Sequence, residues 1–187
     1  MSKQLEGMKV AILATDGFEL VELTKPREAL DQAGAQTEIV APKEGSIRAW
    51  DETDWGDRFS VDRTLDDARP GDYDALLLPG GVLNPDNLRV NERALAFTRA
   101  FFDAGRPVAA ICHGPWTLIN AGVVEGRQMT SYHTIRKDLE NAGARWVDES
   151  VVEDRGLVTS RNPDDLPDFC EAIVRVFAGS RRETAAT

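Results

Sequence analysis

The sequence predicts an α/β fold, a three-layer sandwich in which helices cover both faces of a mostly parallel central sheet. Short, unbroken apolar segments alternate along the chain with longer segments of helical spacing, and glycines or prolines separate most of them. Strands that are buried on both faces are typically unbroken apolar runs, as in parallel sheets covered by helices. The 187 residues contain no repeat and no linker, so we expect one domain over 1–187, with a core at about 8–178 and a frayed tail at 179–187.

The first third of the chain predicts two strands of the sheet, a helix and an excursion from the sheet. Residues 8–15 (MKVAILAT) are an apolar run that ends at an Asp-Gly pair, which indicates a buried strand. Residues 19–32 have apolar or small residues near helical spacing and stop at Ala-Gly, a helix C-terminus. Residues 37–41 (TEIVA) predict a second strand. In 43–69 aromatic residues stand among many acids, and this looser pattern predicts short strands or a hairpin outside the main sheet.

The middle of the chain predicts two further strands, each followed by glycine and a helix. Residues 74–79 (DALLLP) form a buried strand that opens into a Gly-Gly pair, and residues 92–104 form a helix with an Ala/Phe face. Residues 107–111 (PVAAI) form the next strand, which runs directly into Cys-His-Gly. A helix over 115–120 follows, and its first residue is a proline, which suits a first helical turn.

The last third predicts a smaller strand, a helix, a hairpin and a final helix. Residues 128–132 are expected to be a strand and 135–141 a helix that ends near a glycine. The segments 146–153 and 157–160 resemble a hairpin that turns at Arg-Gly. An Asn-Pro pair begins the last helix, which we expect to run over 162–178. Strand–helix alternation of this kind predicts a flavodoxin-like arrangement.

Charge and cysteine content exclude several classes of protein. The net charge of −10 would repel a polyanion, so binding of nucleic acid is not expected. The longest apolar run is too short to cross a membrane, and the polar N-terminus is unlike a signal peptide, so we expect no membrane partner. Two distant cysteines form neither a disulfide framework nor a metal motif, which favours a reducing cytoplasm. Cys170 lies on an apolar face of the last helix and is expected in the core.

Cys112 is the strongest candidate for chemistry. It stands between a buried strand and a helix in PVAAICHGP, where a tight turn would push its side chain outward as a nucleophile elbow. The N-terminus of the following helix would favour the thiolate and lower the pKa of the thiol. Gly114 lacks the Cβ that would hinder such a turn. A buried structural cysteine is the alternative, and the flanking His and Gly disfavour it.

The chain has two histidines, and both are near candidate site positions. His113 follows Cys112 directly and is a candidate general base, acid or orienting partner, although adjacent residues on a turn can diverge. His133, after Tyr132, precedes a helix. We interpret His133 either as a residue at the rim of the pocket or as a surface histidine.

Two further strand ends carry candidate groups. Gly80-Gly81 follows a buried strand and, together with the His113 amide, would form an oxyanion hole; a plain tight turn is the alternative. Glu19 follows the first strand, where its carboxyl group would either hydrogen-bond the cysteine sulfur or interact with the helix dipole. Glu22, one turn further on, is expected to be an exposed or interface acid.

The chain resembles the PfpI family of cysteine hydrolases, within the superfamily of the Parkinson-associated protein deglycase and the class I glutamine amidotransferases. The resemblance rests on KVAILATDGFELVEL, DYDALLLPGG, PVAAICHGPWTLINAG and RQMTSYHTIRKDLENAGARWVDESVV, which are distributed along the domain between residues 8 and 177. The histidine directly after the cysteine is similar to the PfpI branch, because the deglycase branch usually has alanine there. His133 departs from the proline that is more usual after Ser-Tyr.

The resemblance implies roles for individual residues. Cys112 would be the nucleophile, His113 its catalytic neighbour and Glu19 the acid that hydrogen-bonds the sulfur, with Gly81 and the His113 amide as the oxyanion hole. Members of this branch assemble as dimers or hexamers, in which an acid from a neighbouring subunit orients the histidine. Asp86 is the best match to that acid, where relatives often have the longer glutamate. Tyr132 and His133 would lie at the rim of the pocket.

The resemblance also implies a stress-associated cytoplasmic enzyme without metal or organic cofactor, acting on a small carbonyl compound or on a peptide or protein. Conversion of reactive dicarbonyls or removal of glycation adducts is the first hypothesis. An intracellular cysteine peptidase is the second, and a redox-sensing or chaperone-like stress protein is the third. Relatives also oxidise this cysteine to a sulfinic acid, which implies the same for Cys112, held by Glu19. The enzyme hypotheses share thiolate addition to a carbonyl carbon, stabilisation of the oxyanion and proton transfer.

Overall fold

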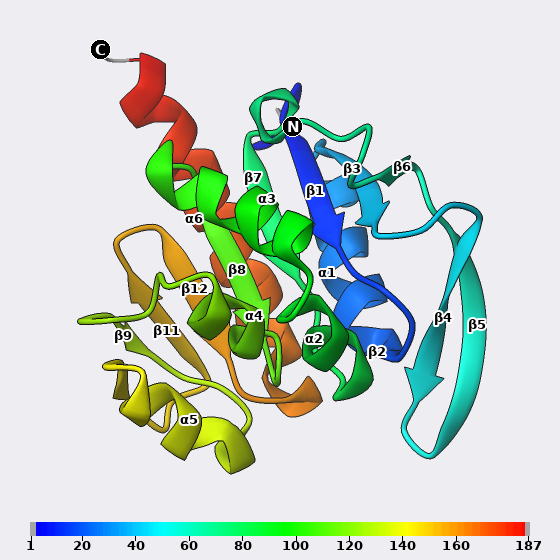
Figure 1. Ribbon diagram of the computed structural model, residues 1–187. Coiled ribbons are helices and arrows are strands. Elements are labelled where there is room, and N and C mark those ends of the chain that lie inside the picture. The colour runs from blue at the N-terminus through cyan, green and yellow to red at the C-terminus, as the bar shows by residue number, and fades with distance from the viewer. Residues whose placement is uncertain (1–2, 186–187) are drawn as a thin grey trace.

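A seven-stranded, mostly parallel sheet forms the centre of the molecule (Figure 1). The computed structural model describes residues 3–185, with side chains as far as residue 181. The strands follow the spatial order β11-β12-β8-β7-β1-β3-β6, and each neighbouring pair is parallel except the antiparallel pair β11–β12. Their bounds are β1 Lys9–Leu13, β3 Gln36–Ala41, β6 Arg63–Thr64, β7 Ala75–Leu78, β8 Val108–Ile111, β11 Val151–Asp154 and β12 Leu157–Ser160.

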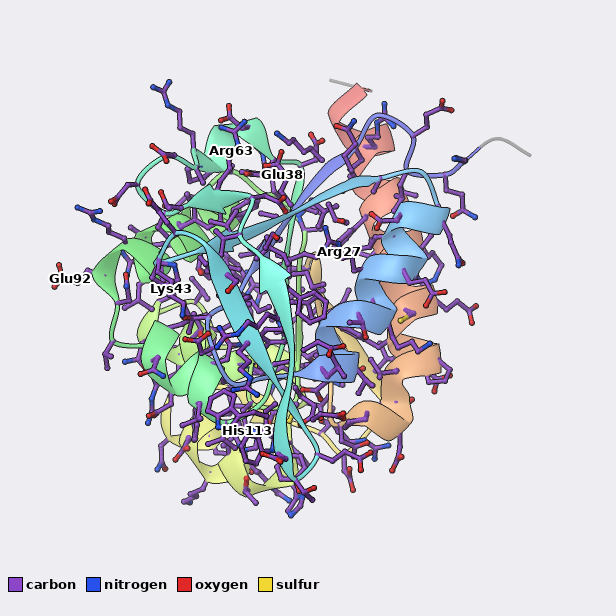
Figure 2. All side chains as sticks on the ribbon, turned by 90° about the vertical axis from the view of Figure 1, so that its right-hand side faces the viewer. Arg27, Glu38, Lys43, Arg63, Glu92 and His113 are labelled. Atoms are coloured by element: carbon purple, nitrogen blue, oxygen red, sulfur yellow. The ribbon has the colours of Figure 1, made fainter. Side chains whose placement is uncertain are left out.

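Helices cover both faces of this sheet, which confirms the predicted flavodoxin-like three-layer sandwich. Helices α1 (Leu20–Gln32) and α6 (Leu166–Ala185) lie side by side on one face, as Figure 2 shows. The other face carries α3 (Glu92–Asp103) and α4 (Pro115–Asn120), with α2 (Leu83–Leu88) and α5 (Arg136–Asn141) beside α4. Three 3₁₀ turns complete the helical elements of residues 3–185: Pro70–Asp72, His133–Ile135 and Pro163–Asp165.

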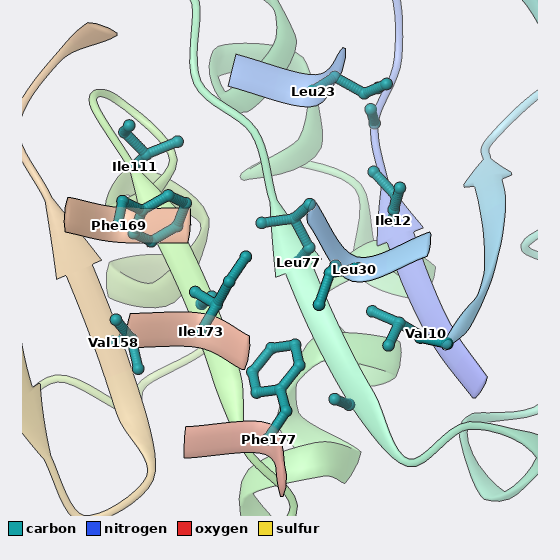
Figure 3. Close-up of a cluster of buried hydrophobic side chains, with 14 of the residues drawn as sticks. Val10, Ile12, Leu23, Leu30, Leu77, Ile111, Val158, Phe169, Ile173 and Phe177 are labelled. Atoms are coloured by element: carbon teal, nitrogen blue, oxygen red, sulfur yellow. The ribbon is translucent and has the colours of Figure 1, made fainter. Parts of the chain in front are cut away.

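The sheet separates two hydrophobic cores. Successive residues of a strand point to opposite faces, so β1 sends Val10 and Ile12 toward α1 and α6, and Ala11 and Leu13 toward α3 and α4. Figure 3 shows the first core, in which Phe169, Ile173 and Phe177 of α6 and Leu23 and Leu30 of α1 pack on the sheet. The residues of β7, β8 and β12 and all but the first of β1 are buried, which explains why unbroken apolar runs identified β1, β7 and β8.

A hairpin projects from the sheet and returns to its carboxyl edge. Strands β4 (Ser46–Asp51) and β5 (Asp54–Ser60) are antiparallel, as expected for the loosely patterned region 43–69. The two-residue strand β2 (Phe18–Glu19) pairs in parallel with β4, so that Glu19 lies opposite Trp50. This pairing fixes the tip of the hairpin beside the end of β1.

Three predictions about secondary structure are corrected, and one helix was missed. Helix α2 was not predicted. The expected strand 128–132 is limited to β9 (Gln128–Met129), which pairs with β10 (Arg145–Trp146) in a separate two-stranded sheet. The expected strand 146–153 is therefore divided between β10 and β11. Helix α6 continues to Ala185, so 179–185 are helical rather than frayed, while 186–187 lie outside the described residues.

The carboxyl ends of β1, β7 and β8 meet at one edge of the sheet, and the candidate site residues follow these three ends. Ligands of parallel α/β sheets bind at such an edge. In residues 3–185, no helix has the length and apolar character needed to cross a membrane.

Candidate active site

Cys112 occupies the tight turn predicted between β8 and the following helix. Its φ is +63°, in the left-handed region, which Glu52 and Arg155 also adopt among the described non-glycine residues. A non-glycine residue is held in this region only by strong surrounding contacts, and such residues gather at active sites. A Cβ on Gly114 would come within 2.8 Å of the Leu78 carbonyl oxygen, so the turn requires glycine there, as predicted.

His113 contacts the thiol of the preceding residue. Its Nδ1 lies 3.2 Å from Cys112 Sγ, and its Nε2 lies 3.4 Å from Thr134 Oγ1. The ring stacks on Tyr132 with the centroids 4.9 Å apart, and Trp116 meets it edge-on at 5.0 Å. These contacts hold the imidazole against the sulfur, so the two adjacent side chains converge rather than diverge.

The imidazole of His113 is neutral at physiological pH. Burial, together with the charge of nearby His133, lowers its pKa to about 4. A neutral imidazole accepts a proton through one ring nitrogen, so His113 has the protonation state of a general base.

The carboxyl group beside Cys112 belongs to Glu22, which corrects the roles expected for Glu19 and Glu22. Glu22 is fully buried, and its Oε1 accepts the Gly81 N–H at 3.2 Å. Its Oε2 has no partner of ordinary hydrogen-bond geometry, and the Cys112 thiol is the polar side chain that borders this carboxyl. The half-buried Glu19 points toward the hairpin instead and accepts the Glu52 N–H at 3.2 Å. Any acid that holds an oxidised Cys112 is therefore Glu22 rather than Glu19.

Burial keeps Glu22 protonated. Desolvation, followed by the charge of Glu19, raises the pKa of Glu22 to about 8. At neutral pH this side chain is a carboxylic acid, which donates as well as accepts a hydrogen bond.

The pKa of the Cys112 thiol is raised, contrary to the expectation from a helix N-terminus. Burial is the main cause, and the charge of ionised Glu22 is the second. Helix α4 has six residues, and its dipole does not outweigh desolvation. The amides of Gly81 and His113 act in the opposite direction, because both donate toward the sulfur and stabilise its anion.

The Gly80-Gly81 loop approaches the site too closely for any side chain. A Cβ on Gly80 would lie 2.5 Å from Glu22 Oε1 and 2.6 Å from Cys112 Cβ. Gly81 has φ +77°, and a Cβ there would meet the Gly17 carbonyl oxygen at 2.4 Å. The loop therefore packs its backbone against the Glu22 carboxyl group and the Cys112 side chain, with the Gly81 N–H donated to Glu22 Oε1, and its role as an oxyanion hole remains a prediction.

A buried asparagine that the sequence analysis missed holds this loop. Asn84 donates to the carbonyl oxygens of Pro79 and Gly80, both at 3.1 Å, and accepts the Thr15 N–H at 2.8 Å. It thereby ties the end of β1 to the end of β7. An asparagine at the third position after Gly-Gly is the available sequence signal, and by itself it does not distinguish this role from a surface turn.

Cys112 opens into a cavity of about 660 Å³. Its lining residues come from the three strand ends, the hairpin and the segment after Ser131. They are Gly17, Glu19, Glu22, Trp50, Glu52, Gly81, Val82, Leu83, Cys112, His113, Tyr132, Thr134 and Pro163. Tyr132 lines the cavity as expected, whereas His133 is exposed and packs behind the Tyr132 ring at 4.6 Å. Of the two interpretations of His133, the surface histidine is therefore correct.

The hairpin supplies one wall of this cavity. Trp50 and Glu52 come from β4 and the following turn, and Figure 2 shows His113 beside this hairpin. The Trp50 Nε1–H donates to the Glu52 carbonyl oxygen at 3.0 Å and braces the turn. The sequence analysis did not place either residue in the site. For Glu52 the reason is that an acid in a turn is ordinarily solvated.

Asp86 and Cys170 lie away from the thiol. Asp86 is half exposed on α2 and forms an ion pair with Arg89 at 2.7 Å, and the Arg89 guanidinium lies over the Trp116 ring. The expected partner of Asp86 is a histidine of another subunit, so the role of Asp86 remains a prediction. Cys170 is partly exposed in the groove between α1 and α6, which corrects its expected place in the core.

Comparisons with known proteins agree with this geometry. The model of the DJ-1/PfpI family matches residues 8–176. The chain is 43% identical over 170 residues to Deglycase TK1284 of Thermococcus kodakarensis, covering 91% of this chain and 99% of that protein. It is 45% identical over 166 residues to General stress protein 18 of Bacillus subtilis, covering 87% and 94% of the two chains.

A solved structure shares the fold over nearly its whole length. The crystal structure of Drosophila melanogaster DJ-1beta superposes with a TM-score of 0.83 at 26% identity, covering 96% of both chains.

Proposed function

The chain belongs to the DJ-1/PfpI family, and on that premise we propose that it is a stress-associated deglycase whose nucleophile is Cys112. The observation that carries the proposal is the convergence of a strained, buried thiol, a neutral imidazole and a protonated carboxyl group in one cavity. Similarity to Deglycase TK1284 and to General stress protein 18 supports the substrate class and the association with stress.

The proposed chemistry begins with addition of the thiol to a carbonyl carbon. His113 accepts the thiol proton through Nδ1, the sulfur forms a bond to the carbon, and the π electron pair moves to the carbonyl oxygen. The N–H groups of Gly81 and His113 stabilise the resulting oxyanion. Glu22 is the acid within reach that returns a proton to the reacting group.

The net reaction would be hydrolysis of an early glycation adduct. A methylglyoxal adduct of an amine takes up one water, releases the free amine and yields lactate, so that atoms and electrons balance without a cofactor. Free methylglyoxal would be converted to lactate by the same groups. Cytoplasmic location remains a prediction.

The experiment that tests this function measures lactate formation together with the free amine. Methylglyoxal-treated peptide is incubated with the wild type, Cys112→Ala and Cys170→Ala at equal folded concentration. We expect equimolar lactate and amine from the wild type and Cys170→Ala, and none from Cys112→Ala. Lactate formed faster than the adduct spontaneously releases methylglyoxal is the decisive result, because free methylglyoxal would itself be converted to lactate. Absence of lactate in the wild type would reject the proposal.

We also propose that copies of this chain assemble through the surface around α2. Val82, Leu83 and Val90 are large apolar side chains that are 53%, 45% and 75% exposed, and they lie close to Asp86 in the chain. Apolar side chains gathered on a surface mark interaction sites. Val90→Asp should lower the mass measured by light scattering, whereas Asp57→Asn, on the hairpin, should leave it unchanged.

A further inference from the structure

Both peptide groups that flank Cys112 are held by distant segments of the chain. The Cys112 N–H donates to the Ser160 carbonyl oxygen at 3.1 Å, and the Cys112 carbonyl oxygen accepts the Tyr132 N–H at 2.9 Å. The angles φ and ψ of a residue describe how the two peptide planes beside it are oriented. These two hydrogen bonds therefore hold Cys112 at φ +63°, a conformation that is unfavourable for a residue with a side chain.

The Ser160 carbonyl oxygen is itself held through the other end of its peptide group. Strand β12 ends at Ser160, so this peptide lies beyond the last paired residue of the strand. The N–H of the same peptide belongs to Arg161 and donates to Asp165 Oδ2 at 3.0 Å. Because a peptide group is planar, fixing its N–H also orients its carbonyl oxygen. Asp165 is thus linked to the backbone of Cys112 through a single peptide group.

The carboxylate of Asp165 is buried and held in a fixed orientation. The Arg161 side chain donates to it through Nε, at 2.9 Å from Oδ2, and through Nη2, at 2.8 Å from Oδ1. A contact with both oxygens sets the plane of a carboxylate as well as its position. The Nη1 of Arg161 donates to the exposed Asp148 at 2.9 Å. Oδ2 of Asp165 is therefore a rigid acceptor for the backbone N–H.

Asp165 and Arg161 act at a distance from any bound substrate. Neither residue lines the cavity at Cys112, although Pro163, between them in the chain, does. Any effect of Asp165 on the reaction must therefore pass through the backbone. The alternative is an ion pair that only stabilises the fold, and it predicts a loss of overall stability without a separate change at Cys112.

We propose that Asp165 is a positioning residue, which keeps Cys112 in its left-handed conformation by orienting the Ser160–Arg161 peptide. In that conformation the sulfur lies 3.2 Å from His113 Nδ1. Release of the Ser160 carbonyl oxygen would allow Cys112 to turn to an ordinary negative φ and would carry the sulfur away from the imidazole. The inference rests on the proposed role of Cys112 as the nucleophile.

The first test follows the backbone of Cys112 and does not require catalysis. Amide hydrogen exchange is measured by NMR, and the protection of the Cys112 N–H is divided by that of Leu77, at the centre of the sheet. This ratio corrects for changes in overall stability. We expect Asp165→Ala to lower the ratio at least about tenfold, because the acceptor of the Cys112 N–H is no longer fixed.

Two variants separate the backbone contact from the ion pairs. Asp165→Asn keeps an oxygen that accepts the Arg161 N–H, so the ratio should stay within about threefold of the wild type. Asp148→Ala removes the other acid that pairs with Arg161, which is bound through the guanidinium rather than through the backbone, and should leave the ratio unchanged. An unchanged ratio in Asp165→Ala would overturn the inference, as would an equal fall in Asp148→Ala.

The wild type provides a test that does not depend on the folding of any variant. If the Asp165 contact holds the Ser160 carbonyl oxygen, opening of the Arg161 N–H also opens the Cys112 N–H. The protection factors of these two amides should then agree within about threefold. Exchange of the Arg161 amide that is more than about thirtyfold faster, with Cys112 still protected, would reject the proposed link.

A second test measures lactate formation from methylglyoxal. Asp165→Ala should lower kcat at least about tenfold and leave KM within about twofold, because the nucleophile is misplaced while the cavity lining is kept. Asp165→Asn should restore most of the lost kcat. A lower exchange ratio with unchanged kcat would reject the positioning role. If the wild type forms no lactate, the deglycase function fails, and the exchange measurements alone decide the inference about Asp165.

Discussion

The carboxyl group of Glu22 borders the thiol of Cys112, although the first belongs to helix α1 and the second to the end of β8. Both groups are buried, and burial raises the pKa of each; the charge of ionised Glu22 further raises the pKa of Cys112, whereas the hydrogen bond with Cys112 lowers that of Glu22. At neutral pH the pair therefore carries a proton on Glu22, and the reactivity of the sulfur depends on that proton.

The first prediction concerns the rate at which Cys112 is alkylated. Glu22→Gln removes a charge that forms above about pH 8, so the thiol pKa should fall by roughly one unit and alkylation at pH 9 should become about tenfold faster. Below pH 7 the two proteins should react at similar rates. Iodoacetamide labelling followed by mass spectrometry measures this, and Cys170 serves as the internal control. A constant rate ratio from pH 6 to 10 would contradict the coupling.

The same substitution should change how stability depends on pH. The pKa of Glu22 rises from 4.5 to about 8 on folding, so the folded state binds its proton more tightly than the unfolded state does. The wild type should thus lose up to about 4 kcal/mol of unfolding free energy between pH 5 and 9 relative to Glu22→Gln. Urea denaturation at several pH values tests this. Glu28→Gln, exposed on the same helix, should follow the wild type.

A substitution at Gly81 should be far more harmful than one at another glycine with positive φ. Gly81→Ala forces a Cβ against the Gly17 carbonyl oxygen, while Gly122→Ala has similar φ, +74°, and meets nothing within 4 Å. We expect a loss of about 1 kcal/mol for Gly122→Ala and about 3 kcal/mol or more for Gly81→Ala. Chemical denaturation measures the loss of unfolding free energy in both variants. Equal losses would show that the loop around Gly81 moves to accommodate the added Cβ.

Asn84 should matter more than an exposed asparagine of the same helix. Asn84→Ala leaves two carbonyl oxygens and the Thr15 N–H without partners, for which we expect a loss of about 3 kcal/mol and a drop in lactate formation. Asn87→Ala removes one exposed hydrogen bond to the Leu83 carbonyl oxygen and should cost less than about 1 kcal/mol. Similar losses in the two variants would disprove the role of Asn84.

The protonation of His113 can be observed directly. Its imidazole should titrate in NMR spectra with a pKa of about 4, and His133→Gln should raise that value because it removes a nearby charge. With two histidines in the chain, the same variant assigns the signals. A measured pKa of 6 or above would show that His113 is more solvated than the structure indicates.

The strands and the position of Cys112 at the turn after β8 were predictable because their signals are local. Unbroken apolar runs identify β1, β7 and β8, since both faces of each strand are buried. The elbow at Cys112 follows from a strand, a cysteine and a glycine in immediate succession. Helix α2 was missed because LNPDNL has no helical apolar spacing and contains a proline.

The roles of the acidic residues were predicted less well, because their burial is set by tertiary structure. Glu22 stands three positions after Glu19 in the chain, and no local pattern shows which of them faces the sheet edge. Glu52 reaches the cavity only through the pairing of β2 with β4, a contact between distant segments. Sequence spacing predicted the position of Cys112, and packing determined which carboxyl groups surround it.

The hairpin of β4 and β5 is structurally separate from the turn that carries Cys112. It contributes Trp50 and Glu52 to the cavity, yet it belongs to a separate three-stranded sheet outside the central one. Mutations in residues 51–54 can therefore alter which compounds are accepted while the machinery around the sulfur is preserved. This division allows new specificities to evolve, or to be engineered, by replacing one short surface segment.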